Sequence, residues 1–104
     1  MNDMEEIIMD IIVNGGDARA KAIEAIRAAR EGRFDVAEEL MKKADVSLTV
    51  AHNSQTGLIQ QEVNGNHQTV TLLMVHAQDH IMNAQTVYEL ATEMIEDAKM
   101  RSRK

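Results

Sequence analysis

Apolar residues recur at helical spacing along most of this chain. They stand three or four positions apart from Met4 to Ile12, from Ala18 to Ala29, and from Ala37 to Ile59. This period places them on one face of an amphipathic helix. Proline, which interrupts helices, is absent from the sequence. The pattern therefore predicts an all-α chain whose helices each have one apolar and one polar face.

Glycines divide the first third of the chain. Gly15-Gly16 interrupts the first apolar stretch, and Asp17 can cap the piece that follows. The sequence leaves open whether this region is one bent helix or two short ones. Gly32 stands where a helix C-terminal cap is expected, because glycine adopts the left-handed conformation without strain.

Two further signals set the later boundaries. Asp35 and Glu38 have the spacing of a capping box, which predicts that the next helix starts at Asp35. The segment 64–66, Asn-Gly-Asn, ends that helix and begins a loop. A third helix is expected from about Thr69 to Met100. Three helices joined by short turns predict an antiparallel, up-down-up three-helix bundle, with residues 1–104 forming one domain.

The third helix carries two mainly apolar stripes instead of one. The first stripe holds Leu73, His76, His80, Val87, Leu90 and Met94, and the second holds Met74, Ala77, Ile81, Ala84, Tyr88, Ala91 and Ile95. Together they cover an arc on the order of 200°, which is wider than a surface helix needs. One stripe can pack on the helix's own bundle. The other then needs a partner, and copies of the same chain are the simplest candidate.

Composition narrows the possible partners. The net charge of −6 argues against nucleic acid, whose binding needs clustered Lys and Arg. No segment approaches the roughly 18 to 20 apolar residues that span a bilayer, and Asp3, Glu5 and Glu6 give the N-terminus the wrong charge for a secretory signal. Cysteine is absent, so no disulfide can form. We expect a cytoplasmic protein without nucleic-acid binding or direct membrane insertion.

Reactive side chains are concentrated in the segment 75–82, Val-His-Ala-Gln-Asp-His-Ile-Met. His76 and Asp79 are three positions apart, and His76 and His80 are four apart, so all three share one side of a helix. Asp79 could accept a hydrogen bond from one ring nitrogen of His76. The other nitrogen would then be free to act as a nucleophile near neutral pH.

Three interpretations of this cluster stay open on the residues alone. The cluster can be a polar group that satisfies itself on an oligomer-facing helix and fixes its register. It can be a zinc site through His76 and His80, although protein zinc sites usually have three or four ligands. It can also be a phosphoryl-transfer site with His76 as nucleophile. The corresponding functions are a helical oligomeric adaptor without chemistry, a metal-binding bundle, and a phosphotransferase.

The segment 72–82, Leu-Leu-Met-Val-His-Ala-Gln-Asp-His-Ile-Met, resembles a known family signature. It is similar to the enzyme IIA component of the bacterial phosphoenolpyruvate-dependent sugar phosphotransferase system (PTS), in its lactose/cellobiose family. Residues 15–19 resemble the first helix of that family, residues 32–35 its first turn, and residues 51–59 its second helix. The likeness spans nearly the whole chain in the right order. One departure is a short loop at residues 64–68, where some members are longer.

The resemblance implies a phosphocarrier with a phosphohistidine intermediate. His76 matches the phosphorylated histidine, and the phosphoryl group is expected on its Nε2 atom. The phosphohistidine carrier protein HPr would donate this group. A cysteine of the cognate IIB component would accept it, while the membrane component IIC imports a β-linked disaccharide of the lactose, cellobiose or chitobiose class.

The resemblance also implies an assembly and several supporting residues. Family members are homotrimers of three-helix subunits, which agrees with the double stripe. Asp79 matches an aspartate near the threefold axis, where three copies can share a structural Mg²⁺, an ion that prefers oxygen ligands. His80 is expected as an interior or interface polar group, with a supporting role near the phosphoryl group as the alternative, and Gln78 faces either solvent or a partner. His52 either lines the cleft beside His76 or is a satisfied histidine of the bundle.

Overall fold

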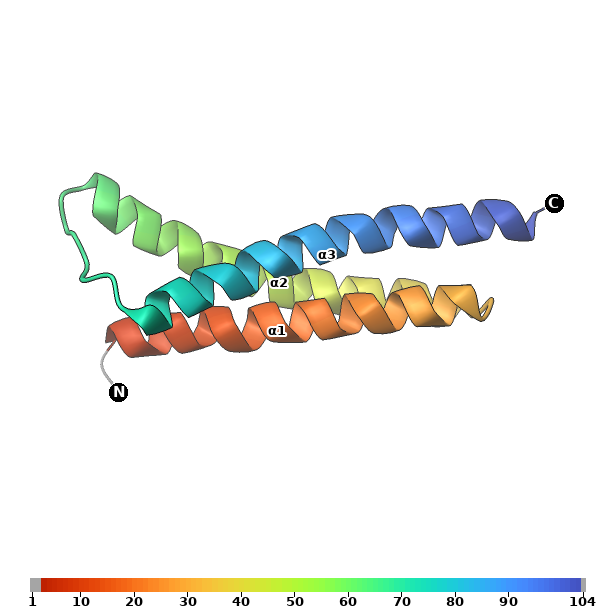
Figure 1. Ribbon diagram of the computed structural model, residues 1–104, viewed down its shortest axis with the longest axis horizontal. Helices are drawn as coiled ribbons and strands as arrows, with labels where there is room; N and C mark the ends of the chain where they lie inside the picture. The colour runs from red at the N-terminus through yellow and green to blue at the C-terminus, as the bar shows by residue number, and fades with distance from the viewer. Residues whose placement is uncertain (1–2, 104) are drawn as a thin grey trace.

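The computed structural model describes residues 3–103 and consists of three long helices. They are α1 (Asp3–Arg30), α2 (Phe34–Val63) and α3 (Leu72–Ser102). The helices run up, down and up, so α1 and α3 are parallel and α2 is antiparallel to both (Figure 1). The predicted all-α three-helix bundle is therefore confirmed. Within the described residues, none of these helices has an apolar run long enough to span a membrane.

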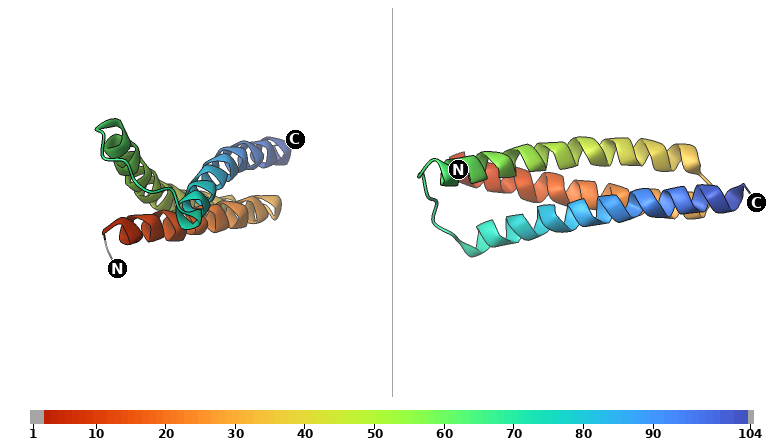
Figure 2. Two further views of the ribbon diagram at one scale, coloured as in Figure 1. Left: turned by 60° about the vertical axis from the view of Figure 1, so that its left-hand side comes forward. Right: turned by 90° about the horizontal axis from the view of Figure 1, so that it is seen from above.

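The helices do not pack evenly against one another. α1 contacts both other helices extensively, whereas α2 and α3 touch each other much less. α2 and α3 move apart toward the loop that joins them, as Figures 1 and 2 show. The bundle measures 56 × 24 × 19 Å. α3 consequently has two flanks, one bordered by α1 and the other by α2.

α1 is one continuous helix through Gly15-Gly16. A Cβ atom built on Gly15 would lie 3.4 Å from the carbonyl carbon of His80 and 3.5 Å from Cα of Ile81. Gly15 is therefore the point at which the backbones of α1 and α3 approach closely, and not a break in the helix. At the end of α1, Gly32 has a φ of +80°, which confirms its predicted role as a C-terminal cap.

Asp17 is not a helix cap, contrary to the prediction. It lies inside α1, where its carboxylate forms an ion pair with Lys21 one turn later. The same carboxylate accepts a hydrogen bond of 2.6 Å from Oγ of Ser47 on α2. These two bonds lower the pKa of Asp17. Aspartate favours N-cap positions, but Asp17 instead links α1 to α2.

The predicted capping box at the start of α2 is also wrong. α2 begins at Phe34, and Arg33 occupies the N-cap position without a side-chain hydrogen bond. Asp35 lies inside the first turn. Glu38 does not reach back to the cap, because its carboxylate pairs with Lys99 near the end of α3. A tertiary ion pair has replaced the local bond that the sequence suggested.

α3 begins three residues later than predicted. Thr71 precedes it as the N-cap, and Oγ1 of Thr71 accepts a hydrogen bond of 3.1 Å from the amide of Met74. The helix then continues to Ser102, two residues beyond the predicted end. The loop that leads to it contains Gly65, whose φ of +87° requires the left-handed conformation.

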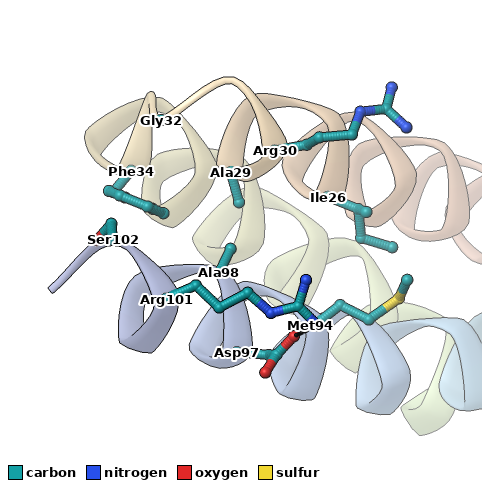
Figure 3. Close-up of a pocket in the computed structure, with 10 residues that line it drawn as sticks. All are labelled: Ile26, Ala29, Arg30, Gly32, Phe34, Met94, Asp97, Ala98, Arg101 and Ser102. Atoms are coloured by element: carbon teal, nitrogen blue, oxygen red, sulfur yellow. Dashed lines mark ion pairs between the residues drawn. The ribbon is translucent and has the colours of Figure 1, made fainter. Parts of the chain in front are cut away.

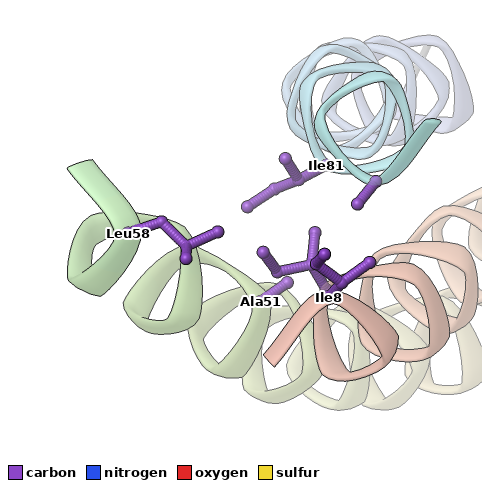
Figure 4. Close-up of a cluster of buried hydrophobic side chains, with 6 residues drawn as sticks. Ile8, Ala51, Leu58 and Ile81 are labelled. Atoms are coloured by element: carbon purple, nitrogen blue, oxygen red, sulfur yellow. The ribbon is translucent and has the colours of Figure 1, made fainter. Parts of the chain in front are cut away.

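The core contains two clusters of different composition. The cluster nearer the α2–α3 loop holds larger side chains and joins all three helices: Ile8, Ile11, Ala51, Leu58, Ala77 and Ile81 (Figure 4). The cluster at the opposite end is mostly alanine: Ala25, Ala28, Ala29, Ala37 and Ile95. Alanine buries little area but lets helices approach closely.

The structure decides which stripe of α3 belongs to the core. Most of the second predicted stripe is buried, namely Ala77, Ile81, Ala84, Ala91 and Ile95. In the first stripe, Leu73, Leu90 and Met94 remain 44%, 56% and 52% exposed in the single chain. An apolar stripe on the α1 flank of α3 is thus left without a cover, as expected for a chain that assembles with copies of itself.

Candidate functional site

The predicted histidine cluster lines one pocket on the α1 flank of α3. The pocket has a volume of about 490 Å³, and its lining comes from α3 and from one residue of α1: His76, Asp79, His80, Asn83, Val87 and Arg19. His76 and Asp79 are exposed and His80 is half-buried. The ring of His76 can therefore be reached from solvent in a single chain, which a nucleophile for a visiting protein requires.

The two histidine rings of the pocket contact each other directly. Nε2 of His76 and Nε2 of His80 are 3.0 Å apart, and the ring planes make an angle of 84°. In such a pair one nitrogen donates a proton and the other accepts it. The tautomers of the two rings are therefore coupled. Sequence reasoning suggested Asp79 as the partner of His76, but no hydrogen bond joins them in the described chain.

α1 shapes the pocket through its two adjacent glycines. A Cβ on Gly16 would lie 3.8 Å from Nδ1 and 4.0 Å from Cε1 of His80, while Gly15 faces the backbone beneath the ring. A long side chain at Gly16 would occupy the space of the His80 ring. The glycine pair, which the sequence showed only as an interruption, lets α1 pass directly beside the histidines.

Arg19 is the lining residue of greatest chemical interest that the sequence reasoning missed. It follows Gly16 by three positions, so it continues the same face of α1 that meets His80. Arg19 is exposed, and its guanidinium makes no ion pair or hydrogen bond with any residue in the described part of the chain. The available signal was this i, i+3 spacing, but only the packing of α1 on α3 shows where that face points.

Gln78 points away from the histidine pocket. Its Oε1 accepts a hydrogen bond of 2.6 Å from Nε2 of Gln55, a residue of α2 that is only 8% exposed. Gln78 is half-buried on the α2 flank of α3. Within one chain it therefore neither faces open solvent nor supports His76, but holds α2 and α3 together.

His52 also lies on the α2 flank, in a different pocket from His76. Its Nδ1 is 3.3 Å from Nε2 of Gln85, and Tyr88 and Asp45 line the same pocket. Partial burial, and to a lesser degree the charge of Asp45, raise the pKa of the Tyr88 hydroxyl. Of the two alternatives for His52, a single chain shows the histidine that bonds within the bundle and not one that lines the pocket of His76.

The metal-binding potential of one chain is small. Among residues 3–103, no group of three or more His, Cys, Asp or Glu side chains is placed to hold a metal ion. His76 and His80 offer two nitrogens, fewer than the three or four protein ligands of most zinc sites. Asp79 offers one exposed carboxylate. Carboxylate oxygens suit Mg²⁺, but a site built from Asp79 needs further copies of the chain.

A second pocket occupies the other end of the groove between α1 and α3. It has a volume of about 560 Å³, and Ile26, Phe34 and Met94 give it apolar walls (Figure 3). Arg101 at its edge pairs with Asp97 at 2.8 Å. Its lining includes neither histidine nor cysteine, so this pocket extends the apolar groove without adding a reactive group.

A sequence model of the family described as "PTS system, Lactose/Cellobiose specific IIA subunit" matches residues 6–99. The chain belongs to this lactose/cellobiose-specific IIA family. The resemblance inferred from the histidine segment is thus confirmed over nearly the whole chain.

Curated relatives agree with this assignment. The IIA chain is 50% identical over 94 residues to a lichenan-specific phosphotransferase enzyme IIA component of Bacillus subtilis, covering 90% of this chain and 86% of the relative. It is 39% identical over 94 residues to the N,N'-diacetylchitobiose-specific EIIA component of Escherichia coli K12, covering 90% and 81%. These relatives differ in the sugar they are named for, so the family is shown but the sugar is not.

Solved structures share the fold over the full length. The cellobiose-specific enzyme IIA of Bacillus anthracis superimposes with a TM-score of 0.94 at 43% identity, covering 100% of this chain and 95% of that one. The IIA(Chitobiose) chain from a solution structure of its complex with HPr gives 0.83 at 34% identity, covering 98% and 99%. This IIA chain is therefore a phosphotransferase component of a sugar-uptake system of the lactose, cellobiose or chitobiose class.

Proposed function

We propose that His76 carries the phosphoryl group in this IIA component. Phospho-HPr donates the group to Nε2 of His76, and a cysteine of the cognate IIB component accepts it during uptake of a β-linked disaccharide. The observation that carries the proposal is the exposed His76 ring, which lines an open pocket and whose Nε2 lies 3.0 Å from a second imidazole. A relative was solved as an IIA(Chitobiose)–HPr complex, which supports HPr as the donor.

The chemical step is a direct exchange between two imidazoles. The unprotonated Nε2 of His76 attacks phosphorus while the bond from phosphorus to the donor's ring nitrogen breaks. The donor ring leaves as neutral imidazole if its other nitrogen already carries a proton. His76 keeps the proton on Nδ1, so the positive charge moves from one ring to the other. Such transfers depend mainly on position and charge stabilisation.

His80 supports this step through its tautomer. When Nε2 of His80 is the donor in the 3.0 Å pair, Nε2 of His76 is the unprotonated, nucleophilic atom. Once the phosphoryl group is attached, the same N–H of His80 is free to donate to a phosphoryl oxygen. The second imidazole thus selects the reactive form of the first and then stabilises the product.

The proposal includes a homotrimer with the exposed stripe of α3 at its interface. Leu73, Leu90 and Met94 supply apolar surface on the flank that also holds the pocket. Three Asp79 carboxylates near the threefold axis would hold a structural Mg²⁺, which would relieve the repulsion among them. Gln78 and His52 have structural partners within the chain, so a supporting role for either would depend on a neighbouring subunit.

Labelling tests the proposed function directly. The chain is incubated with phosphoenolpyruvate, enzyme I and HPr, and the expected product carries one acid-labile phosphoryl group per chain. His76→Ala abolishes the label, whereas His80→Ala and His52→Ala retain it. A label that survives in His76→Ala would move the site to another residue. Complete absence of label in the wild-type chain would favour an adaptor without chemistry.

A further inference from the structure

The phosphoryl group of the proposed intermediate would increase the negative charge of its pocket. A phosphoryl group carries about −1.5 to −2 charges near neutral pH, and the Asp79 carboxylate lines the same pocket. The carboxylate and the phosphoryl group would repel each other, which disfavours the doubly ionised form of the phosphoryl group. Among the residues that line the pocket, Arg19 is the one permanent cation.

The packing of the helices brings the Arg19 side chain toward the rings. α1 and α3 are parallel and meet where Gly15 faces the backbone of His80. Arg19 follows this contact by one turn, roughly 6 Å along the axis. Side chains on a helix lean toward its N-terminus, and Arg19 lines the same pocket as His76 and His80.

Among residues 3–103, no carboxylate pairs with the Arg19 guanidinium. Lys21 pairs with Asp17, and Lys99 pairs with Glu38. Arg19 makes no such bond within the described residues, although it extends from the same helix as Lys21. An arginine side chain presents a planar fork of donors that matches phosphoryl oxygens in a bidentate arrangement.

We propose that Arg19 binds the phosphoryl group on His76 and stabilises it during transfer. This inference rests on the proposed function and adds a residue from a second helix to the reaction. Arg19 touches the transferred group itself, so it acts as a catalytic residue.

The first experiment measures phosphoryl transfer from phospho-HPr to the full-length chain in single turnovers. Arg19→Ala is expected to slow the transfer about ten- to hundred-fold, the range for loss of a hydrogen bond to a charged group. Arg19→Lys restores the positive charge without the planar, bidentate guanidinium. Its transfer rate should therefore lie between those of the wild-type chain and Arg19→Ala. Arg27→Ala is the matched control, because it removes one exposed arginine from the same helix outside this pocket and should transfer at the wild-type rate.

A second measurement separates phosphoryl binding from a purely structural effect. The pH titration of the phosphoryl group is followed by ³¹P NMR in the phosphorylated chain. A neighbouring cation favours the doubly charged form, so Arg19→Ala should raise the apparent pKa of the phosphoryl group. Arg27→Ala should leave that pKa unchanged. Far-UV circular dichroism checks that each variant keeps the helical fold.

The outcomes distinguish this inference from the proposed function. If wild-type chain is labelled on His76 but Arg19→Ala and Arg27→Ala match in rate and in titration, Arg19 has no phosphoryl role and only this inference fails. If the Arg19 effect disappears in an Asp79→Asn background, Arg19 serves to neutralise Asp79 and does not bind the phosphoryl group. If the wild-type chain takes no label, the proposed function itself fails.

Discussion

The two flanks of α3 each hold a histidine, but they differ in what surrounds it. On the α1 flank, His76 faces a second imidazole, an uncommitted arginine and an open pocket. On the α2 flank, His52 faces the amide of Gln85. A side-chain amide can also fix a tautomer, but it does not titrate and offers no cation to a phosphoryl group. These neighbours favour His76 over His52 for the proposed phosphoryl transfer.

The flanks also differ in their exposed surface. The α1 flank displays the apolar side chains of Leu73, Leu90 and Met94 beside the pocket. On the α2 flank, the amides of Gln78 and Gln85 bond to residues of α2. The first flank is suited to contact copies of the chain, whereas the second is largely engaged within it. His76 is thus on the side where subunits of the proposed trimer would meet.

The largest expected effect is loss of assembly when the α1 flank is made polar. Leu90→Glu places a charge on the exposed apolar stripe and should convert the proposed trimer to monomers, because burying an unpaired carboxylate is costly. Light scattering measures the change. Met82→Glu is the matched control, since Met82 is similarly exposed at 52% but stands outside that stripe. Equal behaviour of the two variants would contradict the assignment of the α1 flank as the interface.

A second prediction concerns the close approach of α1 and α3. Gly15→Leu forces atoms against the His80 backbone and should lower the free energy of unfolding by about 3 kcal/mol. Gly57→Leu is the control, because a Cβ at Gly57 meets nothing within 4 Å, and leucine favours helix over glycine. Chemical denaturation compares them. A tolerated Gly15→Leu would show that this approach does not need glycine.

A smaller effect is expected for the link between α1 and α2. Ser47→Ala removes the hydrogen bond to Asp17 and should cost about 1 kcal/mol at pH 7. The native pKa of Asp17 is lowered, so its stabilising contribution is present above the unfolded-state pKa and is lost as pH falls through the native one. The difference between variant and wild type should therefore shrink in acid. A constant difference across this range would exclude the carboxylate as the partner.

The smallest effect is expected for the exposed ion pair between α2 and α3. Lys99→Met should lower the melting temperature less than Ser47→Ala does, and the loss should vanish in high salt. The pair lowers the pKa of Glu38 and raises that of Lys99. Its contribution is therefore lost as pH falls through the native pKa of Glu38 or rises through that of Lys99. Salt-independent destabilisation would point to packing of the lysine stem instead.

The histidine cluster and the number of helices could be predicted from sequence because both depend on local spacing. His76, Asp79 and His80 share a side of any helix that contains them. The caps at Asp17 and Asp35 could not be predicted reliably. A capping signal is local, whereas the carboxylates of Asp17 and Glu38 bond to residues of other helices, Ser47 and Lys99, in the folded chain.

The sequence by itself indicated an all-helical bundle, the approximate ends of its helices and one side of α3 that holds His76, Asp79 and His80. Only the tertiary structure decided which stripe of α3 is buried, because periodicity describes one helix in isolation and both stripes satisfy it. It also decided that Gly15-Gly16 brings α1 against His80 and that Arg19 enters the pocket. These features depend on the relative position of α1 and α3, whose contacting residues Gly15 and His80 lie more than fifty positions apart in sequence, and no local pattern encodes that position.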